Sequence, residues 1–319
     1  MKKLSVIVPA YNEEEVIELF YNKLKEVIDK ITEKYEYEII FVDDGSKDET
    51  LNKLKKLRQS DKNIKIISFS RNFGKEAGIY AGLENSKGDI VVLLDADLQH
   101  DPENIIQMLK YIEEGYDTVT TIRNRKGESK IKSWFSNMFY KIMSGNKQIK
   151  LKKGSQDFRM MTRQVVQAIL DLKEYNRFSK GIFSWVGFKT KYIEVENHKR
   201  AAGKTKWSFT NLFRYAIDGI TSFSVAPLKI ATICGSIVSI LSLIFAIEII
   251  IQTLAMGKDV PGYASTITSV LFMGGIQLVT IGILSEYVGK IYLEVKGRPQ
   301  YIAKEKIIGE ENEKNNWRI

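Results

Sequence analysis

Cysteine and histidine are nearly absent from the chain, which has 319 residues but only one cysteine and two histidines. Cys234 has no partner for an internal disulfide, and a single thiolate excludes the multi-cysteine zinc and iron–sulfur sites. His100 and His198 are too few for a histidine-rich metal cage. A metal ion, if the chain binds one, must therefore be held mainly by oxygen ligands.

Glycine-rich phosphate loops are also missing. The first strand-like run leads into residues 9–15 (PAYNEEE), which contain no glycine. A dinucleotide-binding dehydrogenase needs a Gly-x-Gly-x-x-Gly turn at this point so that the pyrophosphate can approach the backbone. A Gly-x-x-x-x-Gly-Lys phosphate loop is absent as well. A nucleotide would therefore have to be held by side chains and a metal ion.

Charge is missing from two long segments, Ile230–Ile247 with 18 residues and Val260–Ser285 with 26. At about 1.5 Å per helical residue, and with the apolar stretch that follows Glu248, each segment is long enough to cross a hydrocarbon core of about 30 Å. The link between the two apolar stretches, residues 257–259, is short and therefore predicts an antiparallel two-helix transmembrane hairpin over residues 227–290. Basic residues on both flanks place both termini in the cytoplasm. The alternative is a pair of buried helices in a soluble core. We expect no signal peptide, because the basic start leads directly into a strand-like run.

Positive charge is concentrated in one stretch of a chain whose formal net charge is +9. Residues 123–153 hold ten lysines and arginines against one acidic residue, Glu128. Apolar residues recur at helical spacing over 130–147, which predicts an interfacial helix on anionic membrane lipids. Residues 207–226 are predicted to form a second, juxtamembrane amphipathic helix. The alternative for both is an ordinary helix packed on a soluble domain. Nucleic acid could use the same charge, but it would not explain the hairpin, so we expect no nucleic-acid partner.

The first 122 residues alternate short apolar runs with helical segments, which is typical of βαβ units and a parallel sheet. The predicted strands are Leu4–Val8, Glu38–Val42, Ile64–Phe69, Ile90–Leu94 and Thr118–Ile122, and the predicted helices begin near Glu13, Lys47, Lys75 and Pro102. Ser46 and Glu49 are spaced as a capping box for the second helix. Ligands of such sheets bind beyond the carboxyl ends of the strands.

Acidic residues follow two of these strands. The second strand leads into residues 43–46 (DDGS) and the fourth into residues 95–99 (DADLQ). Residues two apart on an extended chain face the same side, so Asp95, Asp97 and Gln99 are expected to converge. Two carboxylates and an amide oxygen suit Mg²⁺ or Mn²⁺, which would neutralise the charge on a departing nucleoside diphosphate. The simpler alternative is a loop cap.

Four motifs occur in the order found in family 2 glycosyltransferases with the GT-A fold. They are residues 6–13 (VIVPAYNE), 42–46 (VDDGS), 71–76 (RNFGKE) and 95–100 (DADLQH). More narrowly, the chain resembles the membrane-bound polyprenyl-phosphate glycosyltransferases through residues 155–159 (SQDFR), 200–207 (RAAGKTKW), the hairpin and 297–299 (GRP). The resemblance implies an α/β GT-A domain over residues 1–206, with a Rossmann-like, parallel-rich sheet and helices on both faces. Residues 291–319 would form a cytoplasmic C-terminal tail.

The resemblance also implies roles for individual residues. The nucleotide sugar would be bound by Pro9, Tyr11, Glu13, Asp43, Asp95 and Arg123, the metal ion by Asp95, Asp97 and Gln99, and phosphates by Arg200 and Lys206. Asp157 and Asp97 would be catalytic, with Asp157 as a base near the acceptor. Simpler roles remain open. Pro9 and Tyr11 could shape a turn, Asp44 could anchor its loop, Asp157 could pair with a nearby arginine, and Arg200 and Lys206 could be topology charges. His100 is expected to shape its loop rather than to titrate in catalysis.

The activity implied by the resemblance is inverting, metal-dependent transfer of a sugar from a nucleotide sugar to polyprenyl phosphate in the cell membrane. UDP-glucose is the expected donor, Mg²⁺ or Mn²⁺ the expected metal, and a homo-oligomer the expected assembly. One alternative is a glycosyltransferase that acts on another lipid or on a cell-envelope polysaccharide. The Gln-x-x-Arg-Trp motif of processive relatives is absent, which disfavours a polymerase. A second alternative is a non-catalytic membrane scaffold that binds nucleotides, which would need no metal-binding carboxylates.

Overall fold

The computed structural model describes residues 1–123, 152, 154–195, 221–222, 224–256 and 262–309. The predicted basic helix over 130–147, most of the predicted juxtamembrane helix, and the side chains of Arg123, Arg200 and Lys206 lie outside the described residues. The chain divides into two compact units. One contains Met1–Arg214 together with Arg298–Ile319, and the other contains Tyr215–Gly297.

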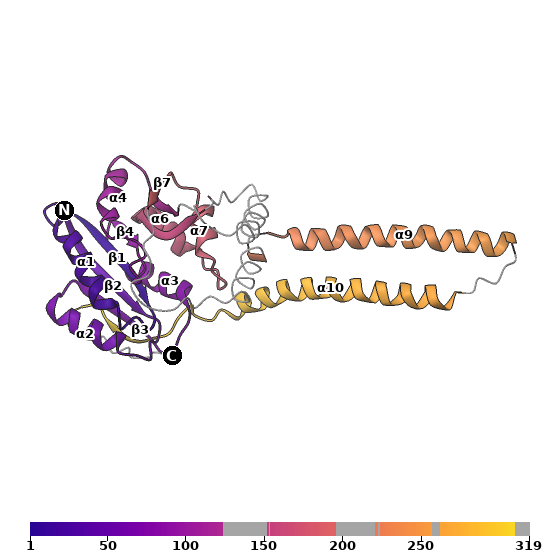
Figure 1. The fold of residues 1–319 in the computed structure, drawn as a ribbon, viewed down its shortest axis with the longest axis horizontal. Helices are drawn as coiled ribbons and strands as arrows, with labels where there is room; N and C mark the ends of the chain where they lie inside the picture. The colour runs from indigo at the N-terminus through magenta and orange to yellow at the C-terminus, as the bar shows by residue number, and fades with distance from the viewer. Residues whose placement is uncertain (124–151, 153, 196–220, 223, 257–261, 310–319) are drawn as a thin grey trace. The chain divides into compact units, whose positions relative to one another are not determined.

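The first unit is built on a mixed, mostly parallel sheet (Figure 1). Within the described residues, eight strands lie in the order β7-β5-β6-β4-β1-β2-β3-β8. They are β1 (Lys2–Ala10), β2 (Tyr35–Asp43), β3 (Ile64–Phe69), β4 (Ile90–Leu93), β5 (Thr118–Arg123), β6 (Ser155–Thr162), β7 (Thr190–Val195) and β8 (Ala303–Ile307). Strand β1 pairs in parallel with β2 and β4, and β2 pairs in parallel with β3. The predicted parallel-rich α/β sheet is therefore confirmed.

Antiparallel strands complete this sheet. Strand β6 lies between β4 and β5 and runs antiparallel to both, whereas β5 and β7 are parallel. Strand β8 runs antiparallel to β3 at the opposite edge. Strands β6, β7 and β8 were not predicted from the sequence, and residues 291–319 were expected to form only a tail. The end of the chain therefore contributes a strand to the sheet that the first third of the chain begins.

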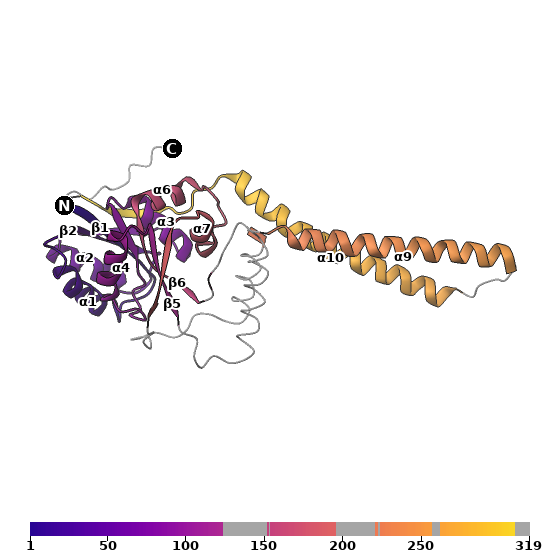
Figure 2. The same cartoon turned by 90° about the horizontal axis from the view of Figure 1, so that it is seen from above.

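Helices cover both faces of the sheet, as predicted (Figure 2). They are α1 (Ile17–Asp29), α2 (Thr50–Ser60), α3 (Lys75–Asn85), α4 (Asn104–Glu113), α6 (Arg163–Asp171) and α7 (Ser179–Trp185). Successive strand residues point to opposite faces. Accordingly, Ile39 and Phe41 of β2 are buried with α1, α2 and α4, while Ile40 and Val42 are buried with α3. Helix α3 packs closely enough that a Cβ atom at Gly82 would overlap the side chain of Ile7.

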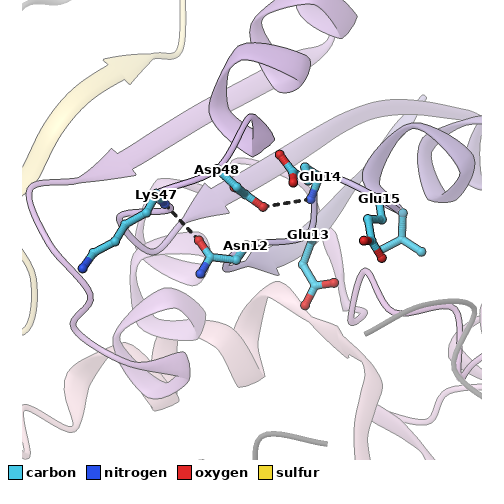
Figure 3. A pocket seen from close by; sticks show the side chains of 7 residues that line it. Asn12, Glu13, Glu14, Glu15, Lys47 and Asp48 are labelled. Carbon is cyan, nitrogen blue, oxygen red and sulfur yellow. Dashed lines mark hydrogen bonds between the residues drawn. The ribbon is translucent and has the colours of Figure 1, made fainter. Parts of the chain in front are cut away.

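Two helices begin later than predicted, at Ile17 rather than Glu13 and at Thr50 rather than Lys47. The capping box of Ser46 and Glu49 was wrong. The Ser46 hydroxyl accepts a hydrogen bond from the Asn12 backbone N–H at 2.9 Å. The Lys47 N–H donates to Asn12 Oδ1 at 2.9 Å, as Figure 3 shows. These side chains join the loop after β1 to the loop after β2, so Ser46 does not cap a helix.

The second unit contains the two long helices α9 (Ala226–Met256) and α10 (Tyr263–Lys296), which run antiparallel in Figure 1. By length and composition, Ala226–Gln252 and Ser265–Lys296 are apolar enough to cross a membrane, and neither is buried within the unit. Both helices were predicted, but α10 continues beyond the predicted end at residue 290. It ends at Gly297, which adopts a left-handed conformation (φ 60°) and donates its N–H to Glu294.

Candidate active site

Asp43 ends β2 and is only 1% exposed. Its Oδ1 accepts a hydrogen bond from the Ser46 N–H at 3.0 Å, and its Oδ2 accepts one from the Ser68 hydroxyl at 2.7 Å. The parallel register pairs Asp43 with Ala10, so the carboxylate lies beside the residue that follows Pro9. The structure therefore brings Pro9 and Asp43, two of the predicted nucleotide-binding residues, to the carboxyl edge of adjacent strands.

Asp44 anchors a neighbouring loop, one of the alternatives that its position in the sequence left open. Its carboxylate accepts hydrogen bonds from the backbone N–H groups of Phe73 at 2.6 Å and Gly74 at 2.9 Å. Burial raises the pKa of Asp44 to about 6, although these two donors act against the shift. Gly74 has φ 95°, a conformation that suits glycine, and the next residue begins α3. Asp44 thus fixes the start of α3 against the end of β2.

Tyr11 and Glu13 directly follow β1, and the carbonyl of Glu13 accepts the N–H groups that open α1. Glu13 also lines a pocket of about 360 Å³ (Figure 3). Its other lining residues are Asn12, Glu14, Glu15, Val16, Lys47 and Asp48. The lining contains four carboxylates and one lysine, so the local charge repels a diphosphate group. The diphosphate of a nucleotide sugar is therefore not assigned to this pocket.

Lys75 joins two of the predicted site carboxylates. Its Nζ lies 2.8 Å from Asp95 and 2.7 Å from Oδ2 of Asp157. Lys180 approaches Asp157 from the other side, with 3.8 Å between Nζ and Oδ1. Asp157 therefore pairs with two lysines, and the charge of the nearby Arg159 also lowers the pKa of Asp157. Lys75 lies in the motif at residues 71–76, but its contacts were not predicted from the sequence.

The sheet explains why these carboxylates meet. Strands β4 and β6 are antiparallel, and their register pairs Leu93 with Arg159. Strand β4 ends at Leu93, and continuing the same register for two more residues would place Asp95 opposite Asp157. Lys75 then reaches both carboxylates from the first turn of α3. Asp95 and Asp157 are far apart in the sequence, so their shared contact with Lys75 depends on a long-range strand pairing.

Charge pairing fixes the protonation states in this cluster. Burial works to lower the pKa of Lys75, but Asp157 and Asp95 outweigh it and raise that pKa above its usual range. Burial likewise works to raise the pKa of Asp157, but Lys75 and Lys180 hold it well below the usual range. Asp157 is therefore a carboxylate at neutral pH and a weak proton acceptor.

Asp97 and Gln99 do not continue β4 as an extended chain. Residues 96 and 97 form a turn, Leu98 has φ 55°, and Asp97 Oδ1 accepts the Gln99 N–H at 3.1 Å. The extended-chain argument for the convergence of Asp95, Asp97 and Gln99 was therefore wrong. The turn still leaves all three on one short loop at the carboxyl edge of the sheet.

The donor set of this loop is compatible with a hard divalent cation. Asp95, Asp97 and Gln99 supply the carboxylate and amide oxygens that Mg²⁺ and Mn²⁺ prefer. Across the described part of the chain, no group of three or more His, Cys, Asp or Glu side chains is arranged to hold a metal ion. A cation held here would need oxygens from a diphosphate or from water to complete its coordination.

Two further charged residues near Asp157, the half-buried Glu76 and the buried Arg159, were not predicted from the sequence. Glu76 accepts hydrogen bonds from the N–H of Ser179 at 3.0 Å and from its hydroxyl, and burial raises the pKa of Glu76. The Arg159 guanidinium lies 3.7 Å from the centre of the Phe183 ring, and burial lowers its pKa to about 10. Such contacts join β6 and α3 to α7.

His100 is 6% exposed and lies against Phe158, with 5.5 Å between ring centres. Burial lowers the pKa of His100, so its ring is neutral at pH 7. This agrees with its expected role in shaping the loop.

Residues 5–170 match the family model for glycosyl transferase family 2, and residues 226–291 match the model for the GtrB C-terminal hairpin. The chain belongs to glycosyl transferase family 2. It is 46% identical over 302 residues to the putative glycosyltransferase CsbB of Bacillus subtilis, covering 95% of this chain and 91% of that one. It is 42% identical over 303 residues to the bactoprenol glucosyl transferase of Shigella phage SfII, covering 95% and 97%. The resemblance seen in the sequence is thereby confirmed, and the protein is a glycosyltransferase.

Among solved structures, the chain is similar to S. aureus TarS 1-349 in complex with UDP-GlcNAc, with a TM-score of 0.48 and 20% identity. That alignment covers 69% of this chain and 66% of the other. It is also similar to glucosyl-3-phosphoglycerate synthase from Mycobacterium tuberculosis in complex with Mn²⁺, UDP-glucose and phosphoglyceric acid. There the TM-score is 0.43 at 18% identity, with 69% and 78% of the two chains covered.

Proposed function

We propose that this glycosyltransferase moves a sugar, with glucose the expected one, from a UDP-sugar to polyprenyl phosphate at the cytoplasmic face of the cell membrane. The observation that carries the proposal is the 42% identity to a bactoprenol glucosyl transferase over 303 residues, because this likeness spans the catalytic domain and the hairpin together. The apolar hairpin supplies a membrane anchor for an enzyme whose acceptor is a lipid. Both termini and the sheet domain are proposed to lie in the cytoplasm. A homo-oligomer stays a prediction.

In the proposed reaction, an oxygen of the lipid-linked phosphate forms a bond to the anomeric carbon of the sugar. The bond from that carbon to the diphosphate oxygen breaks, the electron pair leaves with the nucleoside diphosphate, and the anomeric centre is inverted. Pro9, Tyr11, Glu13 and Asp43 are proposed to hold the nucleoside, and Arg123, Arg200 and Lys206 the phosphates. A divalent cation, held by Asp95, Asp97 and Gln99, would supply charge neutralisation at the departing diphosphate.

The ion pairs of Asp157 refine its proposed role. A phosphate monoester has a second pKa of about 6, so it is already mostly a dianion at pH 7 and needs little help from a base. Asp157 is itself a poor base, because Lys75 and Lys180 stabilise its charged form. We therefore assign Asp157 to positioning cationic groups around the acceptor phosphate rather than to removing a proton.

Replacing Asp97 with Asn tests both the proposed glycosyltransferase activity and the proposed metal site. The full chain in detergent or nanodiscs is supplied with radiolabelled UDP-glucose, polyprenyl phosphate and Mn²⁺ or Mg²⁺, and the label in the lipid extract is counted. We expect label in the lipid only when polyprenyl phosphate and a divalent cation are both present. We expect D97N to reduce turnover at least about a hundredfold, because a carboxylate ligand is lost.

The control is Asp101→Asn, which changes an exposed carboxylate on the same loop and is expected to keep its activity. Unchanged turnover in D97N would reject the metal assignment. Label that appears in a polymer or in another lipid, rather than in polyprenyl phosphate, would reject the proposed acceptor.

A further inference from the structure

Two lysines from different helices face the same carboxylate at the edge of the sheet. Lys75 begins α3 and lies 2.7 Å from Oδ2 of Asp157, while Lys180 of α7 lies 3.8 Å from Oδ1. Each lysine therefore approaches a different oxygen of one carboxylate. Asp157 therefore lies between two ammonium groups.

The placement of Lys180 depends on the residue next to Lys75. Glu76 accepts hydrogen bonds from the backbone N–H and the hydroxyl of Ser179, the residue before Lys180. Glu76 and Ser179 therefore fix the start of α7 to the start of α3. Lys75 directly precedes Glu76 and Lys180 directly follows Ser179. The contact between Glu76 and Ser179 therefore constrains the distance between the backbones of the two lysines.

Both ammonium groups keep donor capacity toward solvent. A lysine has three N–H donors, and Lys75 uses one toward Asp95 and one toward Asp157. The 3.8 Å between Lys180 and Asp157 is too long for a hydrogen bond. The side chains of Lys75 and Lys180 are 42% and 34% exposed, whereas that of Asp157 is 22% exposed. A ligand arriving from solvent therefore meets the lysines before the carboxylate.

We propose that Lys75 and Lys180 bind the phosphate of the acceptor, in addition to the roles proposed above for Arg200 and Lys206, with Asp157 as the residue that positions the two lysines. The assignment rests on the proposed function. Lys75 and Lys180 together balance the carboxylates of Asp95 and Asp157, so the site offers unused N–H donors rather than excess charge. The oxygens of a phosphomonoester accept charge-assisted hydrogen bonds from such ammonium groups. The donor diphosphate is proposed to lie at Asp95 and Asp97. Lys75, which touches Asp95 as well as Asp157, then stands between the donor and the acceptor.

The experiment uses the full chain in nanodiscs and compares Lys180→Gln with Lys180→Arg. Loss of one charge-assisted hydrogen bond is expected to raise the KM for polyprenyl phosphate about tenfold in K180Q, and the arginine should restore most of it. The KM for the UDP-sugar should change less than about twofold, because the donor lies elsewhere. Lys110→Gln, which removes an exposed lysine on α4, is the matched control and should change neither KM.

A binding measurement separates this site from the reaction. Isothermal titration of a short-chain polyprenyl phosphate is carried out without metal or nucleotide sugar, and K180Q is expected to bind it about tenfold more weakly than wild type or K110Q. Lys75→Arg, which keeps the charge that pairs with both carboxylates, should bind within about threefold of wild type.

Three outcomes overturn or separate the claims. A raised KM for the UDP-sugar with an unchanged KM for the lipid would assign the lysines to the donor diphosphate and reject the proposal. Equal lipid phosphate binding in K180Q and wild type would also reject it. Lysine-dependent binding of the lipid phosphate without any lipid-linked product from wild type would support the site and reject the proposed function.

Discussion

Glu38 is a buried carboxylate on β2, 1% exposed, and it is surrounded by donors. Lys65 lies 2.7 Å and Lys3 2.9 Å from Oε2, while the Ser5 hydroxyl at 2.6 Å and the Lys87 N–H at 2.7 Å donate to Oε1. Burial works to raise the pKa of Glu38, but the four donors outweigh it and lower the pKa to about 2. The charged form of this side chain therefore stabilises the fold.

Replacing Glu38 with Gln should change how stability depends on pH. Because the pKa is lowered in the folded protein, the contribution is present above the usual glutamate pKa and is lost as pH falls from about 4.5 to 2. The shift corresponds to about 3 kcal/mol at pH 7. We expect E38Q to unfold at a lower temperature than wild type at pH 7 and the gap to narrow toward pH 3, measured by thermal melts in detergent. Glu36→Gln, an exposed glutamate near the start of the same strand, should follow wild type. A constant gap for E38Q would contradict the linkage.

The positions of some site residues could be predicted from the sequence, but their contacts could not. Asp43 and Asp95 could be placed at strand ends because each follows an apolar run that reads as a strand. The contact of Lys75 with Asp95 and Asp157 could not be predicted, since it requires the β4–β6 register between residues more than 60 apart in the chain. Local spacing also failed at Asp97, where Leu98 turns the chain at φ 55°.

At the scale of elements, the segment after α10 joins the first unit through more than strand pairing. The ring of Tyr301 stacks on Phe69 of β3 with 4.8 Å between centres, and its hydroxyl donates to Glu84 at 2.5 Å and accepts from Asn85 at 3.2 Å. Lys55 of α2 pairs with Glu305 of β8 at 2.6 Å. The segment is thus held by β3 on one side and by α2 and α3 on the others.

Removing the Tyr301 ring should loosen this segment. We expect Tyr301→Ala to destabilise the sheet unit by about 2–4 kcal/mol, because it loses stacking area and the bonds to α3. Tyr301→Phe keeps the ring and should cost about 1 kcal/mol. Proteolysis at residues 298–309 and thermal melts give the readouts, with the exposed Lys304→Ala as the neutral control. Equal protease resistance in Y301A and wild type would show that strand pairing alone holds β8.

Elements differed in how well they could be predicted. The bounds of Ile64–Phe69 matched because six consecutive residues are buried and the pattern is continuous. Helix starts failed at Glu13 and Lys47, because side chains there bond across two loops instead of to their own helix. Strand β6 was missed because both of its partners are antiparallel and distant, so neither leaves a local βαβ signature.

At the scale of the whole molecule, the hairpin helices present apolar side chains that the second unit does not cover. Leu241 in α9 is 60% exposed and Leu278 in α10 is 72% exposed, each near the middle of its helix. Exposing these apolar surfaces to water is unfavourable, whereas exposing them to the hydrocarbon of a membrane is favourable. Together with the match to the hairpin family model, this supports a membrane environment for residues 226–291.

Charges placed at these two positions should oppose membrane insertion. We expect Leu241→Arg with Leu278→Arg to cost about 3 kcal/mol for each arginine and to move most of the protein out of the membrane fraction. Leu241→Ile with Leu278→Ile is the matched control and should stay with the membranes. The measurement is the fraction that resists carbonate washing. Full retention of the double arginine variant would argue against a spanning position for these residues.

Strand β8 has a consequence for the order in which the chain is made. It pairs with β3 along an edge that would otherwise present open backbone donors and acceptors, which invite pairing with other chains. Residues 303–307 follow both hairpin helices in the sequence, so the ribosome releases them only after α9 and α10 have been synthesised. The sheet of the catalytic domain therefore keeps an unprotected edge until the hairpin has emerged. The pairing of β8 with β3 then covers this edge of the sheet.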